Sequence, residues 1–273
     1  MLRETAQRFS RAGLHYGHGT HNAREEAAWL ISSVLGYLLE EEVAPRARHK
    51  IDALVRRRIR ERIPMAYLLK EAWLGEHSFY VDKRVIVPRS FVTELLRDRF
   101  SPWLTRDPRR VLDLCTGSGC LAVLLASTFK AAHVDAADLS GAALAVARIN
   151  VNRYKMKKRI QVVKSDLFES LGDRKYDLIV SNPPYVTARS MQKLPKEYRH
   201  EPALALAAGK DGLDLVRRIL AEAKDHLTPG GLLVCEIGGN RRALERAYPK
   251  IEFGWPETSE GPGSVFILER GQL

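Results

Sequence analysis

An Asn-Pro-Pro-Tyr segment, Asn182 to Tyr185, directly follows an apolar run that is typical of a buried strand. The Asn182 side-chain oxygen and the Pro183 backbone carbonyl could accept the two hydrogens of a planar NH₂ group. Pro183 cannot continue a strand, so it turns its carbonyl away from the strand direction, while Tyr185 offers the planar group a flat apolar wall. An amide or exocyclic amino nitrogen held in this way could be aimed at an electrophile. The alternative is a proline turn with a packing tyrosine.

A second candidate segment is a loop containing Gly117 and Gly119, between an apolar strand and a helix. Glycines let the backbone turn sharply and let a ligand approach closely, and the helix start presents N–H groups that suit an anionic group. Asp138 follows the next strand, where its carboxylate could accept both hydroxyls of a ribose. The pattern indicates a nucleoside cofactor, either a dinucleotide or S-adenosylmethionine. Asp113 favours the latter, because a carboxylate attracts an amino group and repels a pyrophosphate.

Both segments belong to a chain that alternates strands and helices from Arg109 to its end. Repeated units of a short apolar strand and a helix predict an α/β fold, a doubly wound and mostly parallel sheet with helices on both faces. The carboxyl ends of such strands share one edge, so the two segments should lie side by side. The strands are expected at residues 111–115, 133–138, 160–164, 177–181, 232–237, 251–255 and 265–269.

The first hundred residues follow a different pattern. Asn22 and Glu25 have the spacing of a capping box, and a helical stripe of apolar residues follows, made by Trp29, Leu30, Val34 and Leu38. A second helix is expected from about Pro45 to Arg60, and residues 64–88 favour a β-hairpin. We therefore expect an N-terminal helical domain with a hairpin over residues 1–100, followed by a catalytic α/β domain over residues 101–273.

Positive charge is concentrated in two segments of this 273-residue chain, which has 44 Lys+Arg against 33 Asp+Glu and a net charge of +11. Residues 46–62 hold eight basic and two acidic side chains, and residues 153–164 hold six basic and no acidic ones. The first cluster is expected on the solvent face of the second helix, where it could contact RNA. The second is expected at the sheet edge opposite the cofactor.

Several classes of protein are excluded by composition. An apolar share of 45% is typical of a globular chain rather than a disordered one, and no apolar run approaches the roughly 18 residues of a membrane span. The three cysteines lack metal-binding spacing, which argues against a disulfide framework and a zinc site. His15, His18 and His21 have no carboxylate or cysteine to complete a metal site, so we expect surface histidines. The N-terminus is too polar for a signal peptide, and a cytoplasmic enzyme or binding protein is expected.

The sequence resembles the class I, S-adenosylmethionine-dependent methyltransferases that carry the NPPY motif, and among them the protein-(glutamine-N5) methyltransferases. The resemblance covers most of the chain and is carried by Val87–Ser90, Asp113–Gly119, Asp138–Ser140, Asp166–Leu167, Asn182–Tyr185, Glu201–Pro202, Leu206–Asp214, Cys235–Gly238 and Val265–Leu268. It implies a class I methyltransferase sheet of seven strands and a small N-terminal helical domain with a β-hairpin for substrate recognition. The implied cofactor is S-adenosylmethionine, with S-adenosylhomocysteine as product.

Within that family the chain is most similar to the branch that methylates the third protein of the large ribosomal subunit. The segments that favour this branch are Val87–Glu94, Ala207–Asp214 and Gly271–Leu273. The release-factor branch usually reads Ile-Pro-Arg-Pro at the first of them. The resemblance implies a ribosomal protein substrate, either free or in an assembling large subunit where ribosomal RNA could be contacted. It implies no membrane partner and leaves the oligomeric state open.

The resemblance also implies roles for individual residues. The methionine end of the cofactor would be lined by Asp113, Thr116, Gly117, Ser118 and Gly119. Asp138 would hold the ribose, and the adenine would be bordered by Asp166 and Leu167. Asn182 would touch the cofactor as well as the glutamine amide, which would be held by Asn182, Pro183, Pro184 and Tyr185. The catalytic residues would be Asn182, Pro183 and Tyr185, with no metal. Arg89 would lie at the mouth of the site or form a salt bridge with Glu94.

Three alternatives remain from the sequence. One is a release-factor glutamine methyltransferase. Another is a DNA or RNA adenine-N6 methyltransferase, because adenine presents the same planar NH₂ to an NPPY motif, although such an enzyme needs a base-flipping pocket and a substantial recognition domain. The third is a basic RNA-binding ribosome-assembly protein that is not an enzyme and would not bind S-adenosylmethionine.

Overall fold

The computed structural model describes residues 1–36, 43–259 and 261–273, and it divides into two compact units. Unit 1 comprises residues 1–83, 87–89 and 194–201. Unit 2 comprises residues 84–86, 90–193 and 202–273. Residues 90–100, which the sequence groups with the N-terminal helices, belong to unit 2, and the short segment 194–201 belongs to unit 1.

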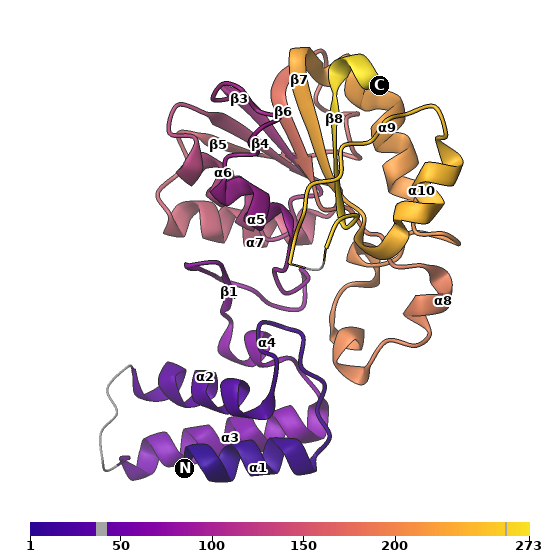
Figure 1. The fold of residues 1–273 in the computed structure, drawn as a ribbon. Coiled ribbons are helices and arrows are strands. Elements are labelled where there is room, and N and C mark those ends of the chain that lie inside the picture. Colours follow the sequence, from indigo (N-terminus) through magenta and orange to yellow (C-terminus); the bar gives the residue numbers. More distant parts are fainter. Residues whose placement is uncertain (37–42, 260) are drawn as a thin grey trace. The chain divides into compact units, whose positions relative to one another are not determined.

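Three helices form the body of unit 1 (Figure 1), namely α1 (Leu2–Arg11), α2 (Ala23–Leu35) and α3 (Pro45–Glu61). The Asn22 side chain caps α2 by accepting the N–H groups of Arg24 and Glu25, each at 3.0 Å, as the capping-box spacing predicts. The apolar stripe of α2 packs with α1 and α3 in one core that includes Leu30 and Val34. Leu38, the last member of the expected stripe, lies outside the described residues.

The rest of unit 1 consists of short elements, which are α4 (Met65–Leu69), β1 (Ala72–Leu74), β2 (His77–Phe79) and the 3₁₀ helix η1 (Lys196–His200). The expected β-hairpin is present but shorter than residues 64–88, since α4 occupies the start of that range. Its two strands pair antiparallel, with Ala72 opposite Phe79. Gly75 at the turn has φ +61°, a backbone conformation that glycine adopts without strain.

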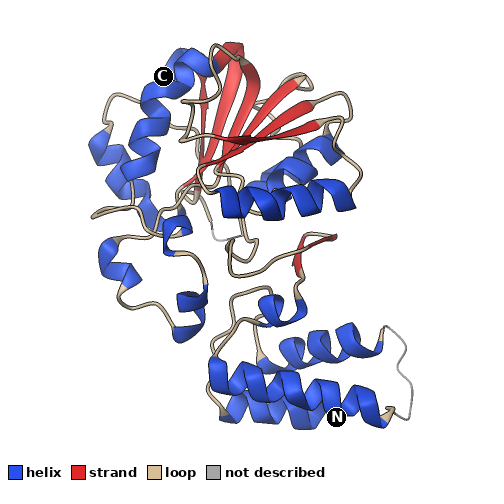
Figure 2. Cartoon of the chain, turned by 180° about the vertical axis from the view of Figure 1, so that it is seen from behind, coloured by secondary structure: helices blue, strands red, loops and turns tan. Residues whose placement is uncertain are grey.

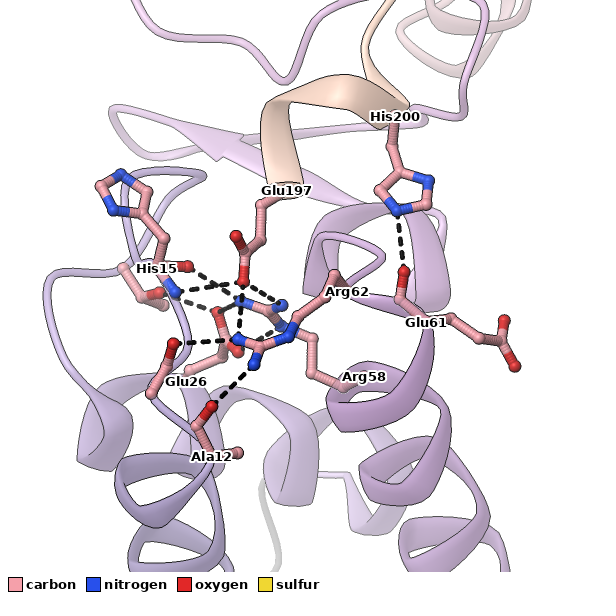
Figure 3. A network of polar contacts seen from close by, with 10 residues as sticks. Ala12, His15, Glu26, Arg58, Glu61, Arg62, Glu197 and His200 are labelled. Carbon is pink, nitrogen blue, oxygen red and sulfur yellow. Dashed lines mark hydrogen bonds and ion pairs between the residues drawn. The ribbon is translucent and has the colours of Figure 1, made fainter. Parts of the chain in front are cut away.

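A buried ion network connects α2, α3 and η1 within unit 1 (Figure 3). The Arg58 side chain is 1% exposed and donates to Glu26 Oε1 at 2.7 Å and to Glu197 Oε1 at 3.3 Å. Arg58 also donates to the His15 carbonyl at 2.9 Å, and Arg62 Nη1 reaches Glu197 Oε1 at 3.4 Å. Because a buried charge is costly unless it is paired and hydrogen-bonded, removing any one partner should destabilise this unit.

Two expectations about unit 1 are corrected by the structure. The basic segment 46–62 does not lie wholly on a solvent face, because Arg58 is buried. The exposed cations of the segment are Arg46, Arg48, Lys50, Arg56, Arg57 and Arg60. The expectation of surface histidines is wrong for His18, which is 3% exposed. Its ring packs at a tilt against Tyr198, with centroids 4.4 Å apart and an interplanar angle of 49°, and its Nε2 lies 3.6 Å from Glu201 Oε1.

Unit 2 contains a sheet with the strand order β5-β4-β3-β6-β7-β8 in the described residues. The strands are β3 (Arg110–Leu114), β4 (His133–Asp138), β5 (Ile160–Lys164), β6 (Tyr176–Ser181), β7 (Leu227–Glu236) and β8 (Val265–Glu269). All neighbours pair parallel except β7 and β8, which pair antiparallel. The predicted doubly wound, mostly parallel α/β sheet is therefore confirmed.

The expected seventh strand over residues 251–255 is reduced to a single bridge. Gly254 exchanges two backbone hydrogen bonds with Ile267 of β8, at 3.0 and 2.9 Å. Pro256 follows shortly and has no N–H group to extend the ladder. The apolar residues that suggested a strand, Phe253 and Trp255, instead pack against Phe266 with centroids 5.2 and 6.3 Å away.

Helices cover both faces of the sheet (Figures 1 and 2). The α-helices of unit 2 are α5 (Val92–Arg97), α6 (Cys120–Thr128), α7 (Gly141–Arg153), α8 (Ala188–Met191), α9 (Asp214–His226) and α10 (Arg241–Ala247). Short 3₁₀ turns are η2 (Ala203–Ala205), η3 (Gly238–Asn240) and η4 (Arg270–Gln272). Helices α6 and α7 lie on one face and α9 and α10 on the other, as both views show. None of the described helices is long and apolar enough to cross a membrane.

The second basic segment, residues 153–164, runs from the end of α7 through β5. Its exposed lysines Lys155, Lys157 and Lys158 precede the strand, at the end of the sheet away from the carboxyl edge. Lys164 departs from the expected position, because it ends β5 in register with Asp138 of β4. Since parallel strands end at a common edge, Lys164 lies on the same side of the sheet as the glycine loop.

Candidate active site

The glycine loop leaves the carboxyl end of β3 and enters α6. Gly117 and Gly119 have φ +55° and +77°, both in the left-handed region. A Cβ atom at position 119 would lie 3.1 Å from the Ala147 Cβ and 3.2 Å from its Cα. The turn and the close approach of α7 therefore both require glycine at this position. The loop is further held by Asn150 of α7, whose Nδ2 donates to the Ser118 carbonyl at 2.8 Å.

Asp113 is fully buried in β3, next to this loop. Its Oδ2 accepts the Thr116 hydroxyl and the Ala122 backbone N–H, the latter at 2.9 Å. Its Oδ1 is also buried and has no hydrogen-bond partner among the described residues. Burial raises the pKa of Asp113 to about 7, against the lowering effect of the bonds from Thr116 and Ala122. A buried acceptor without a donor is costly, so a donor supplied by a ligand would stabilise this oxygen.

Asp138 ends β4 and joins two loops. Its Oδ2 accepts the Gly117 N–H and its Oδ1 accepts the Ser140 N–H, both at 2.8 Å. Burial raises the pKa of this carboxyl group, although the two backbone hydrogen bonds lower it. Each carboxylate oxygen can accept more than one hydrogen bond. Asp138 therefore keeps capacity for the hydroxyl groups of a ligand.

The NPPY segment begins beside the glycine loop because their strands are neighbours. Ser181, the last residue of β6, pairs with Leu114 of β3, and the Ser181 hydroxyl donates to the Leu114 carbonyl at 2.8 Å. The two loops thus leave adjacent strands at the same edge. The Tyr185 hydroxyl donates to Glu236 Oε1 at 3.2 Å.

A pocket in unit 2 brings the two loops together. The predicted site residues that line it are Gly117, Asp138, Asp166, Leu167, Asn182 and Pro184. The other predicted residues of the two loops lie in the same two segments but are not among the residues that line the pocket; they are Asp113, Thr116, Ser118, Gly119, Pro183 and Tyr185. Thr116 and Ser118 are buried, and the Thr116 hydroxyl is used within the loop, in its bond to Asp113.

The pocket is also lined by residues to which the sequence assigned no role in the site. Arg218 of α9 lines the pocket and pairs with Asp166, with Nη1 and Oδ1 2.9 Å apart. Further lining residues are Arg84, Val85, Ile86, Leu139, Ser140, Pro202, Leu204 and Ala205. Leu204 is 59% exposed although it is apolar. A periodic pattern could place α9, but only the packed fold shows which of its arginines turns to the pocket.

Arg89 belongs to unit 1, where it forms a two-point ion pair. Its Nη1 and Nη2 donate to Glu201 Oε1 and Oε2 at 2.8 and 2.7 Å. Burial raises the pKa of Glu201, but the hydrogen bonds and charges of Arg89 and His18 outweigh it and lower this pKa to about 2. Glu94, the partner in the alternative prediction, belongs to unit 2, where it accepts the Ser259 N–H and hydroxyl, both at 2.7 Å.

Comparison with known proteins decides the family. Residues 91–197 match the family described as the methyltransferase small domain. Over the full chain, the sequence is 50% identical to the ribosomal protein uL3 glutamine methyltransferase of Neisseria meningitidis serogroup B, covering 100% of this chain and 93% of that protein. It is 47% identical to the protein of the same name from Burkholderia pseudomallei, covering 100% and 94%. The chain belongs to this family. It is a methyltransferase, so the alternative of a non-enzymatic RNA-binding protein is wrong.

Solved structures support the same fold. A methyltransferase from Pyrococcus furiosus is 20% identical, with a TM-score of 0.53, covering 72% of this chain and 90% of that chain. The catalytic domain of hMettl16, in complex with MAT2A 3'UTR hairpin 1, is 18% identical with a TM-score of 0.54 and covers 89% of each chain. At such identities the likeness establishes the class I methyltransferase fold alone. No cluster of histidine, cysteine, aspartate or glutamate that could hold a metal occurs in the described part of the chain.

Proposed function

We propose that this protein transfers a methyl group from S-adenosylmethionine to the side-chain nitrogen N5 of a glutamine in ribosomal protein uL3. The observation that carries the proposal is the match of the whole chain, at 50% and 47% identity, to relatives named for that reaction. It is supported by the pocket of unit 2, where the glycine loop and the NPPY segment meet. The relatives' names favour uL3 over a release factor, and they favour a glutamine amide over an adenine.

The residues around the pocket fit the proposed cofactor. When bound, S-adenosylmethionine supplies a methyl group on a positively charged sulfur. The unsatisfied, buried Asp113 Oδ1 suits a positively charged amino group, and the Asp138 carboxylate can accept ribose hydroxyls. Asp166 and Leu167 would border the adenine, with Asp166 oriented by its ion pair with Arg218. The short polar loop from Thr116 to Gly119 would surround the methionine end.

The chain's own contribution to the reaction is alignment and charge stabilisation. An amide nitrogen is a weak nucleophile, so it has to be held close to the methyl carbon in the right orientation. The Asn182 side-chain oxygen and the Pro183 carbonyl would accept its two hydrogens, and Tyr185 would bound its planar face. These acceptors stabilise the positive charge that develops on the nitrogen, as preorganised dipoles do in other enzymes.

We assign the exposed cations of unit 1 to a second contact with the partner, namely with ribosomal RNA around the target glutamine. Four arginines of α1 and α3, Arg8, Arg56, Arg57 and Arg60, line a groove in this unit. Phosphate groups are the natural partners of such a surface. The substrate would then be uL3 in an assembling large subunit, and the reaction would take place in the cytoplasm.

The proposal is tested by incubating the purified protein with S-adenosylmethionine and uL3, supplied either as recombinant protein or in large-subunit precursor particles. We expect mass spectrometry to find one additional methyl group on one glutamine of uL3. The Asn182→Ala variant should slow the transfer by roughly 10²–10³, the effect of removing one preorganised hydrogen-bonding group, while cofactor affinity changes little. Methylation of a release factor or of adenine instead of uL3 would refute the substrate assignment.

A further inference from the structure

Tyr185 is held by residues outside both site motifs. Its hydroxyl donates to Glu236 Oε1 at 3.2 Å, and its backbone carbonyl accepts from Asn240 Nδ2 at 2.9 Å. Glu236 ends β7, and Asn240 follows in η3. One contact holds the hydroxyl at the tip of the Tyr185 ring, and the other holds the backbone carbonyl of the same residue. The tyrosine is therefore restrained at its side chain and at its backbone.

Two glycines close the remaining space around Tyr185. A Cβ atom at Gly238 would lie 2.8 Å from the Tyr185 Cε2, closer than real contacts allow. A Cβ atom at Gly212 would lie 2.4 Å from the Tyr185 carbonyl oxygen and 2.5 Å from Asn240 Nδ2. Both glycines also have φ in the left-handed region, at +53° and +79°. The backbone thus packs directly against the ring edge and against the carbonyl.

Glu236 is itself held rigidly, which makes it able to hold another group. The residue is 1% exposed, and its Oε2 accepts the Ser90 hydroxyl at 2.7 Å and the Phe91 N–H at 2.9 Å. Burial raises the pKa of Glu236 to about 7, and hydrogen bonds from Ser90, Phe91 and Tyr185 oppose that rise. A buried carboxyl group lowers the stability of the fold compared with an apolar side chain. Its presence here therefore indicates a role in holding Tyr185 and not in packing alone.

We infer that Glu236 and Asn240 are positioning residues for the acceptor amide: they fix Tyr185, and through it the NPPY backbone that holds the glutamine. The inference rests on the proposed function and deepens it. Neither residue touches the reacting atoms. Loss of either should leave the cofactor bound but let the tyrosine and its neighbouring carbonyl groups drift from the reactive geometry. Small displacements of this kind reduce the rate of a reaction that depends on alignment.

The test compares Glu236→Leu, Glu236→Gln, Tyr185→Phe and the double variant Glu236→Leu/Tyr185→Phe. We expect Glu236→Leu to lower kcat about tenfold, as the loss of one buried hydrogen bond does, with KM for uL3 and calorimetric Kd for S-adenosylhomocysteine nearly unchanged. Glu236→Gln should retain most activity, because its oxygen can face Ser90 and Phe91 while its amide donates to the tyrosine hydroxyl. The double variant should be no slower than the slower single variant.

Thr228→Ala is the matched control on the same strand. Thr228 lies at the other end of β7 and donates to Asp177 Oδ1 at 3.0 Å, so its loss should lower the melting temperature without changing kcat. If Glu236→Leu does not fold, Asn240→Ala tests the same inference at a half-buried position, with an expected fall in kcat of a few-fold.

The positioning role would be overturned if the two single losses of kcat multiplied in the double variant, or if Thr228→Ala lost as much kcat as Glu236→Leu. A large rise in the Kd for S-adenosylhomocysteine in Glu236→Leu would also overturn it. An unchanged kcat in the Glu236→Leu and Asn240→Ala variants would do the same. A wild-type protein that fails to methylate uL3 would instead refute the proposed function, which keeps the two failures distinct.

Discussion

At the scale of single residues, the Asp113 carboxyl group carries the most specific information about the ligand. One of its oxygens is satisfied by the loop, and the other is buried without a partner among the described residues. The raised pKa, about 7, means that folding penalises the charged form. The contribution of protonated Asp113 to the free energy of unfolding is therefore fully present below the ordinary aspartate pKa of 3.8, and it is lost as the pH rises through about 7. A bound cation would reverse that loss.

We expect the affinity for S-adenosylhomocysteine to depend on pH through Asp113. The amino group of the bound ligand pairs with the ionised Asp113 carboxylate, and below pH 7 this carboxyl group is protonated in the free protein. Binding should therefore release a proton below pH 7 and should weaken there by up to about tenfold for each pH unit. Calorimetry at several pH values, in buffers of different ionisation enthalpy, measures both quantities. Asp113→Asn should bind weakly with little pH dependence over this range. An affinity that is flat between about pH 5 and 8 in the wild-type protein would contradict this assignment.

At the scale of elements, the site depends on what neighbouring strands and helices bring to one edge. β3 and β6 are adjacent, so the glycine loop and NPPY emerge together. Helix α9 adds Arg218 to the pocket, whereas the preceding Arg217 turns to Asp211, with Nη2 and Oδ2 2.5 Å apart. One step along a helix rotates a side chain by roughly 100°, which explains why consecutive arginines of one helix have different partners.

Arg218→Ala should weaken S-adenosylhomocysteine binding about three- to tenfold, because Asp166 loses the cation that orients it and the pair is half-exposed to solvent. Arg217→Ala is the matched control, since it removes the same charge from the same helix, and we expect Kd to stay unchanged. Arg218→Lys should lie between them, as a lysine cannot reproduce a guanidinium's geometry. Equal effects of the two alanine variants, measured by calorimetry, would show that only net charge matters.

At the scale of the whole molecule, the net charge of +11 separates into two clusters with different expected roles. In unit 1, the basic segment 46–62 contributes Arg58 to buried ion pairs with Glu26 and Glu197, while its exposed cations lie along α3. In unit 2, the second cluster surrounds the start of β5, and only Lys164 reaches the edge that carries the pocket. Their shared sign therefore does not imply a shared function.

Replacing Arg56, Arg57 and Arg60 with glutamine should weaken binding to ribosomal particles. The loss should shrink as salt is raised, with the slope of log K against log salt falling by roughly one for each phosphate contact removed. The equally charged control replaces Lys155, Lys157 and Lys158, which are also exposed, and should leave binding intact. Equal losses in both triple variants, measured by sedimentation at several salt concentrations, would indicate a non-specific charge effect.

The sequence by itself determined the alternating α/β order, the capped α2, and the two loops at strand ends, because these depend on local periodicity, turn residues and capping groups. It predicted a full strand over residues 251–255, where the structure has a single bridge at Gly254. The apolar residues Phe253 and Trp255 are there because they pack against Phe266, not because they belong to a strand. Only the tertiary structure decided that Arg58 and His18 are buried and that Arg218 meets Asp166. It alone also brought Glu236 and Asn240 to Tyr185. These contacts join residues far apart in the chain, and no local pattern encodes which partners offset the cost of burying their polar groups.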